Sequence, residues 1–182
     1  MAERRVAITG LGVVSAAGLG GEQTWGAFLE ARPCVLPMQL FNADGFACRV
    51  GGQLLDFSAK DYVPKNYRKS VKIMARDIEI AVVAADLAVR DAGLVTRGID
   101  PDALNITPRR FGCNIGAGLI TAELNELGNA IHSAVVDGKF DMGAWGATGM
   151  GNLTPLWLLK YLPNMLSCHV TIIHGAEGPS NN

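Results

Sequence analysis

The chain has 182 residues, of which 49% are hydrophobic and 18% are charged, and its net charge is −1. This length is enough for one domain with a real core, and a net charge near zero gives no reason to expect nucleic acid as a partner. Because an average domain is about 25% charged, the low charged fraction predicts either a large interface or a core that further polypeptide completes.

The four cysteines are scattered along the chain and form no CxxC pair, which indicates the reduced thiols of a cytosolic protein. The first residues lack the apolar run of a signal peptide. No apolar stretch reaches the roughly 20 residues that a membrane span needs. We therefore expect a cytoplasmic protein without a membrane partner.

The chain opens with an apolar run, residues 6–14, whose lack of alternation predicts a strand buried on both faces. Gly10 and Gly12 match half of a dinucleotide-binding fingerprint, but Ser15 stands where the third glycine would be, and no acidic residue follows at the expected distance. The glycines favour instead a strand-to-loop turn in which two backbones pack closely. An α/β nucleotide-binding module remains an alternative.

A first helix is predicted over residues 23–31, followed by an irregular excursion with a short hairpin around residues 47–55. The helix is predicted from three apolar residues that share one face: Trp25, Phe28 and Leu29.

Residues 74–92 predict a longer helix with an apolar face so wide that other elements must cover most of its sides. Asp86 and Arg90 can form an ion pair one turn apart on it. Gly93 follows in the position of a C-terminal cap.

A second glycine-ended strand is predicted over residues 110–118, and the order of elements is typical of parallel α/β units. A helix over residues 120–136, capped by Gly138, should follow, and the glycine-rich residues 139–152 favour a surface loop.

The C-terminal segment contains a helix-start signal at Thr154 and Pro155. Pro163 should divide the segment into a short helix and a second one over residues 163–173, which ends at Gly175. A turn at Gly178 should then lead into a strand beyond the last residue.

Positive charge is densest in residues 61–72. The pattern is consistent with a solvent-exposed segment that leads into a helix, or with a docking patch for an acidic partner. Four side chains make up this group: Lys65, Arg68, Lys69 and Lys72.

Three motifs, taken together and in order, resemble the β-ketoacyl-ACP synthases, the condensing enzymes of fatty-acid and polyketide synthesis. They are RRVAITGLGVVSAAG, RRFGCNIGAG and NMLSCHVTIIHGAEGPS, at residues 4–18, 109–118 and 164–180. The resemblance implies the thiolase-like α/β fold, two similar halves in five αβαβα layers. Residues 1–182 would form most of the first half, as one N-terminal part of a ketosynthase domain.

In that family a cysteine at the head of a buried helix takes the acyl chain as a thioester, which then condenses with malonyl-ACP by decarboxylative Claisen condensation. The resemblance places this nucleophile a few residues past Asn182, and the family's histidine motifs in the second half. Cys34, Cys48, Cys113 and Cys168 do not follow a strand and open a helix, so we expect no catalytic residue in this chain and no activity from it alone.

The resemblance also implies non-catalytic roles. Leu119 matches an apolar gate of the acyl pocket, Trp157 an aromatic position that reaches into the partner subunit of a homodimer, and Met165 a tunnel wall, although ordinary core packing would explain all three. The four cations at residues 65–72 match the region that docks acyl carrier protein. His169 and His174 lie five residues apart, so they diverge and predict no metal site; no cofactor is expected.

The sequence thus predicts the N-terminal part of a β-ketoacyl-ACP synthase, an acyltransferase. Its expected partners are acyl carrier protein and either a second copy or the remainder of the same synthase. A non-catalytic partner subunit of the chain-length-factor type is an alternative, because such subunits share the fold but replace the nucleophile.

Overall fold

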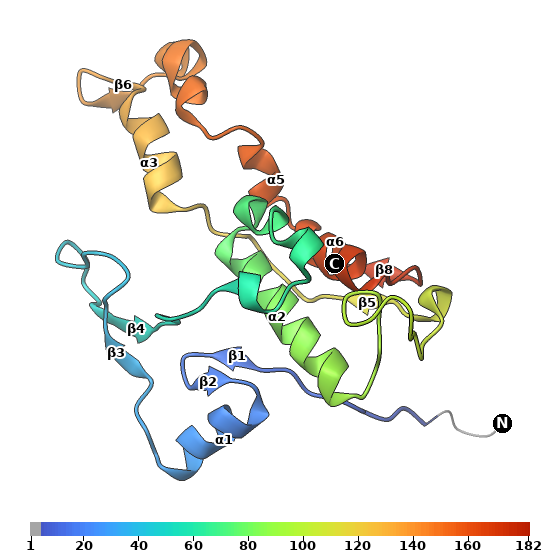
Figure 1. Ribbon diagram of the computed structural model, residues 1–182. Coiled ribbons are helices and arrows are strands. Elements are labelled where there is room, and N and C mark those ends of the chain that lie inside the picture. The colour runs from blue at the N-terminus through green and yellow to red at the C-terminus, as the bar shows by residue number, and fades with distance from the viewer. Residues whose placement is uncertain (1–4) are drawn as a thin grey trace.

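The structure is a computed structural model that describes residues 5–182. Two helices lie at its centre, α2 (Arg76–Asp91) and α6 (Met165–His174). As Figure 1 shows, the N-terminal part of the chain and the segment from α3 to α5 extend away from this pair as separate arms. The core is therefore built mainly from the middle and the end of the chain.

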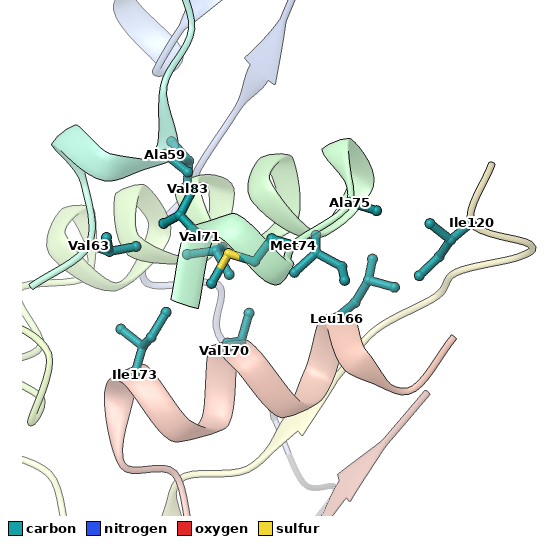
Figure 2. Packing of buried hydrophobic residues seen from close by; sticks show 12 residues of the cluster. Ala59, Val63, Val71, Met74, Ala75, Val83, Ile120, Leu166, Val170 and Ile173 are labelled. Carbon is teal, nitrogen blue, oxygen red and sulfur yellow. The ribbon is translucent and has the colours of Figure 1, made fainter. Parts of the chain in front are cut away.

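The core forms where one apolar face of α6 packs against α2 and against three short 3-10 turns that precede α2. These turns are η1 (Ala59–Asp61), η2 (Lys65–Tyr67) and η3 (Ser70–Ile73). In Figure 2 the α6 side chains point toward Val71 and Met74. The buried residues of this cluster are Ala59, Val63, Val71, Met74, Ala75, Ile78, Val82, Val83, Ile120, Leu166, Val170 and Ile173.

Helix α2 confirms the prediction for residues 74–92. Most of its apolar face is buried, and the Arg90 guanidinium donates to the Asp86 carboxylate at 2.7 Å. The helix ends because Gly93 adopts a left-handed conformation, with φ of 65°, and its N–H donates to the carbonyl of Arg90.

One parallel strand pair confirms the predicted α/β character: β5 (Cys113–Asn114) with β8 (Ser180–Asn181). Strand β8 begins directly after Pro179, so the strand expected beyond the last residue starts within the chain. A Cβ on Gly112 would lie 2.2 Å from the carbonyl oxygen of Pro179, so glycine is required for the two backbones to approach this closely.

The prediction of a buried strand over residues 6–14 is wrong for most of that run. Val6 is 95% exposed and Ile8 is 83% exposed, and only Val14 enters a strand, β1 (Val14–Ser15), in a hairpin with β2 (Gly18–Leu19). Within residues 5–182 no strand pairs with residues 6–13, so their apolar side chains have no sheet to enter.

The glycines of this run nevertheless permit the predicted close backbone packing, but against a helix. A Cβ on Gly12 would lie 2.0 Å from the carbonyl oxygen of Ala84, and one on Gly10 would lie 2.4 Å from that of Ala88. The N-terminal arm is thus anchored on the side of α2.

Helix α1 (Gly21–Leu29) forms as predicted but turns the opposite face inward. Trp25, Phe28 and Leu29 are 63 to 71% exposed. The buried positions of the helix are Thr24 and Ala27, so its smaller side chains face the rest of the arm.

The excursion contains a hairpin that is wider than predicted. Strand β4 (Val50–Gly52) pairs antiparallel with β3 (Val35–Pro37), so a long loop joins them. Arg76 at the start of α2 holds this excursion, since its guanidinium donates to the carbonyl of Leu54 at 2.7 Å and lies over the ring of Phe57.

Helix α3 (Leu124–His132) is shorter than the predicted 120–136. Asp137 and Gly138 have φ of 50° and 75°, which makes them a two-residue turn between β6 (Val135–Val136) and β7 (Lys139–Phe140). An Asp-Gly pair between apolar residues is a strong hairpin signal, and it outweighs the helical spacing.

Residues 139–152 lie mostly at the surface, as predicted, but the prediction of a loop is wrong, because strand β7 is followed by three short helical turns. These are α4 (Met142–Ala144), a π turn (Trp145–Gly149) and a 3-10 turn (Met150–Asn152). The Asp141 carboxylate caps the first of them by accepting from the N–H of Ala144 at 2.7 Å.

Helix α5 (Trp157–Tyr161) begins later than the predicted start at Thr154 and Pro155. Leu156 is left-handed, with φ of 63°, and a helix cannot run through such a residue. The break at Pro163 is confirmed, and so is the end of α6 at Gly175, whose φ is 65°.

Candidate functional site

We define the basic strip as Lys65, Arg68, Lys69 and Lys72. It follows the turns η2 and η3, with Arg68 and Lys69 as the two residues that join them. All four side chains are exposed, and none forms an ion pair with any residue in the range 5–182. Tyr67 and Val71 alternate with them and hold the strip on α6: the Tyr67 hydroxyl donates to the carbonyl of Ile172 at 3.2 Å, and Val71 is buried in the core.

The three predicted acyl-pocket residues are not brought together in one cavity. Leu119 is 94% exposed in the irregular segment between β5 and α3. Trp157 is half-buried at the start of α5, and its ring centre lies 5.0 Å from that of Tyr161. Met165 packs against the core from the first turn of α6, which is the core packing that the sequence left open.

An ion pair and two hydrogen bonds, which no sequence pattern indicated, join α3 to α5. The Lys160 ammonium lies 2.6 Å from one carboxylate oxygen of Glu126, and the Tyr161 hydroxyl donates to the other at 2.8 Å. The Tyr161 oxygen also accepts from the N–H of Glu123 at 3.1 Å. We call Glu126, Lys160 and Tyr161 the α3–α5 clamp.

Charges within the clamp stabilise one another. Burial acts to raise the pKa of Glu126, but the hydrogen bonds from Lys160 and Tyr161 outweigh it and leave that pKa below its ordinary value. Burial likewise acts to lower the pKa of Lys160, but the bond to Glu126 leads a set of contacts that raises it. Both shifts favour the charged forms of Glu126 and Lys160 at neutral pH, whereas burial raises the pKa of Tyr161 and keeps its hydroxyl protonated.

The four cysteines lie where the sequence predicted, and none opens a helix. Cys113 is on β5, where burial raises the pKa of its thiol and disfavours the reactive thiolate. Cys168 is in the middle of α6, and Cys34 and Cys48 lie beside the β3–β4 hairpin. All four are free thiols.

Two buried histidines lie on α6, and they do not converge on a common point. His174 Nδ1 lies 2.8 Å from the Thr96 hydroxyl, whereas His169 makes no side-chain hydrogen bond within residues 5–182. Burial lowers the pKa of both. In the same range no three or more histidine, cysteine or acidic side chains gather as metal ligands.

The glycines at the N-terminus do not form a phosphate site of the dinucleotide-binding type. That site needs glycines at the N-terminus of a helix, where free N–H groups point at the ligand. Gly10 and Gly12 instead pack against the second half of α2, near Ala84 and Ala88.

Two of the larger cavities have none of the predicted site residues in their walls. One, of about 740 Å³, lies between the β1–β2 hairpin, α1 and residues 53–57. The other is an apolar groove of about 430 Å³ between α2, β5 and α6, floored by small residues such as Ala81, Ala85 and Ala88.

Comparison with known proteins identifies the class. The family model for the N-terminal domain of β-ketoacyl synthases matches residues 3–182, so the chain belongs to the β-ketoacyl synthase family. It is 28% identical to 3-oxoacyl-[acyl-carrier-protein] synthase 2 of Vibrio harveyi over 99% of its length, and 30% identical to the synthase of the same name from Synechocystis sp. over 98%. It spans 38% of the length of each of these relatives.

Solved structures agree on the fold. The ishigamide ketosynthase/chain length factor matches 100% of this chain and 39% of its own with a TM-score of 0.69 at 22% identity. A β-ketoacyl synthase from Burkholderia phymatum matches 98% of this chain and 39% of its own with a TM-score of 0.66 at 22% identity. The chain therefore has the thiolase-like α/β fold of the ketosynthases. Among its helices within residues 5–182, none is both long and apolar enough to cross a bilayer.

Proposed function

We propose that residues 1–182 form the N-terminal part of a 3-oxoacyl-[acyl-carrier-protein] synthase. The reaction would load an acyl chain onto a cysteine outside this chain and condense it with malonyl-ACP, with loss of carbon dioxide. The family match over residues 3–182 and relatives that carry this name support the proposal. A polyketide relative, the granaticin putative β-ketoacyl synthase 1 of Streptomyces violaceoruber, is 28% identical over 97% of the chain. The proposal therefore includes both fatty-acid and polyketide synthesis.

The role of this chain would be to receive the carrier protein and to wall the acyl pocket. Leu119, Trp157 and Met165 would contribute to that wall once a second copy or the rest of the synthase covers them. Leu119 is 94% exposed, so its side chain is free to make such a contact. The scattered free cysteines favour a cytoplasmic location.

The basic strip supports the proposed function most directly. Its four cations have no acidic partner within the described chain. The bond from Tyr67 to α6 holds the backbone that carries them, so the strip presents positive charge at a defined place on the surface. Such a surface raises the rate of encounter with an acidic protein by about 10 to 10³-fold at low salt. One solved relative of the fold, at 14% identity and a TM-score of 0.54, is a ketosynthase in complex with a type II polyketide acyl carrier protein.

The test is a titration with acyl carrier protein. Wild-type chain, a Lys65→Glu/Lys69→Glu variant and the control Lys139→Glu, which reverses an exposed charge on β7, are compared by calorimetry at low and high salt. We expect the strip variant to bind roughly tenfold or more weakly, since exposed pairs contribute about 0.2–1 kcal/mol each and reversal adds repulsion. Equal affinity of all three proteins at low salt would remove the carrier-docking role.

A further inference from the structure

Leu156, the residue before α5, lies in a backbone conformation that a leucine rarely adopts. Its φ is 63° and its ψ is 16°, in the left-handed region, where the Cβ of an L-residue lies too close to the following carbonyl oxygen. The side chain is 63% exposed, so burial of its own does not offset this strain. A residue of this kind persists only where the surrounding structure fixes it.

The local sequence favours a different start for α5. Thr154 is of a type preferred as an N-cap, and Pro155 after it suits the first position of a helix. The N–H of Trp157 already donates to the carbonyl of Thr154 at 3.0 Å, which is a turn of the right kind to begin a helix. A right-handed Leu156 would therefore let α5 begin at Pro155.

Both ends of the segment that contains Leu156 are fixed to the same helix, α3. Before the segment, the side-chain amide of Asn152 donates to the hydroxyl of Ser133, the C-cap of α3, at 2.9 Å. After it, the α3–α5 clamp holds α5 to the first half of α3. Figure 1 shows α3 and α5 as the two sides of one arm, connected at its far end. Residues 153–156 must therefore span a gap whose two ends are both fixed.

The clamp is suited to fix one of these ends because both charges of its ion pair are shielded. The side chains of Lys160 and Glu126 are 14% and 21% exposed, whereas each other ion pair among residues 5–182 has a partner at least 35% exposed. Loss of one partner would leave a poorly solvated charge, which is strongly unfavourable. The clamp therefore resists opening more than a surface pair would.

We propose that the α3–α5 clamp is a latch that holds Leu156 in its strained conformation, and that opening the clamp lets α5 extend to Pro155 and turns Trp157. The indole of Trp157 supports a second state, because its Nε1 is buried without a hydrogen-bond partner within residues 5–182. The arm then has two positions relative to α5, selected by whether Glu126 and Lys160 are paired. The inference is independent of the proposed function, since it concerns contacts within the chain.

The test compares Leu156→Gly with Leu158→Gly in urea unfolding of the 182-residue chain. Glycine tolerates the left-handed region but weakens a helix. Leu158 is the matched control, because it lies inside α5 and is 62% exposed, against 63% for Leu156. Each substitution is made in the wild-type chain and in Glu126→Ala, which opens the clamp.

With the clamp closed, Leu156→Gly should raise the urea midpoint, because it relieves the strain. With the clamp open it should lower the midpoint, because residue 156 is then helical. Leu158→Gly should lower the midpoint in both backgrounds. In Glu126→Gln, which removes only the charge and serves if Glu126→Ala does not fold, the rise should be smaller than in the wild type. An equal rise in every background would overturn the inference, and so would a fall in the wild-type chain.

Fluorine NMR of chain labelled with fluorotryptophan gives a second readout that does not depend on stability. The Trp157 signal, assigned from Trp157→Phe, should move when Glu126 is replaced, because α5 turns the ring. Adding Leu156→Gly should return it toward the wild-type position, since glycine favours the left-handed state. A Trp157 signal that neither Glu126 variant moves would overturn the inference.

Discussion

The α2–α6 core and the N-terminal arm, residues 5–55, both carry many large apolar side chains, yet they place them in opposite environments. Ile78 and Ile173 are 0% and 2% exposed, while Val6 and Trp25 are 95% and 63% exposed. The difference follows from what each segment can reach. Two helices of the core cover one another. The arm instead reaches α2 through Gly10 and Gly12, which pack against its backbone, and through hydrogen bonds such as that from Arg76 to Leu54. An apolar sequence thus indicates that a segment favours burial. Whether its side chains are buried in this chain depends on a second helix or strand that packs against them.

The largest effect should come from the core. Ile173→Ala should lower the free energy of unfolding by about 2–5 kcal/mol, because it removes buried methyl groups and leaves a cavity. The control is its neighbour Ile172, which is 52% exposed, and Ile172→Ala should cost about 0.5 kcal/mol or less. Urea unfolding measures both. Similar losses for the two variants would mean that α6 does not pack as described.

The anchor of the arm should come next. Gly12→Ala places a methyl group against the carbonyl oxygen of Ala84, so the arm must shift, at a cost of about 1–3 kcal/mol. Gly26→Ala, on α1, meets no atom within 4 Å and should stabilise the chain by up to about 1 kcal/mol. Hydrogen exchange of residues 6–20 should rise in the first variant alone. Unchanged exchange there would argue against the anchor.

A pH-dependent loss of stability should mark the α6 end of the core. Burial lowers the pKa of His174, and the nearby charges of Asp86 and Arg90 oppose each other. The unfolded chain therefore binds the proton more readily, and stability should fall as the pH drops below about 6.5. His174→Asn should reduce this slope in urea melts between pH 8 and 5, while buried His169 supplies the remainder. His132→Asn, at an exposed site on α3, should retain the full slope. Equal slopes in all three proteins would contradict the burial of His174.

The smallest effect should come from the exposed face of α1. Trp25→Ser should change the free energy of unfolding of this chain by no more than about 0.5 kcal/mol, because the ring has little contact to lose. A urea midpoint that falls as far as that of Ile173→Ala would show that the arm is packed after all.

Local sequence signals were enough to predict part of the fold. Helix α2, the break at Pro163 and the end of α6 at Gly175 were predictable because wide apolar faces, proline and glycine act locally. The conformation of residues 6–14 could not be predicted locally. A buried strand there needs neighbouring strands, and within the described chain no sheet forms around these residues. The hairpin at Asp137 was predictable in principle, because Asp-Gly between apolar residues is a local signal that the helical spacing obscured.

The candidate site divides in the same way. The basic strip is a dense local cluster and was found from the sequence, with all four side chains exposed. The clamp was not found, because Glu126 and Lys160 are 34 residues apart and only folding brings them together. The pocket residues were named by resemblance alone, and their roles stay proposals.

Under the proposed function, this chain is part of a condensing enzyme whose nucleophile is none of its own cysteines. The direct measurement incubates the chain, and the synthase that contains it, with acyl-ACP and maps every acylated cysteine by peptide mass spectrometry. We predict an acyl thioester on the synthase at a cysteine outside residues 1–182, and none on the isolated chain. A thioester on Cys34, Cys48, Cys113 or Cys168 would contradict the account.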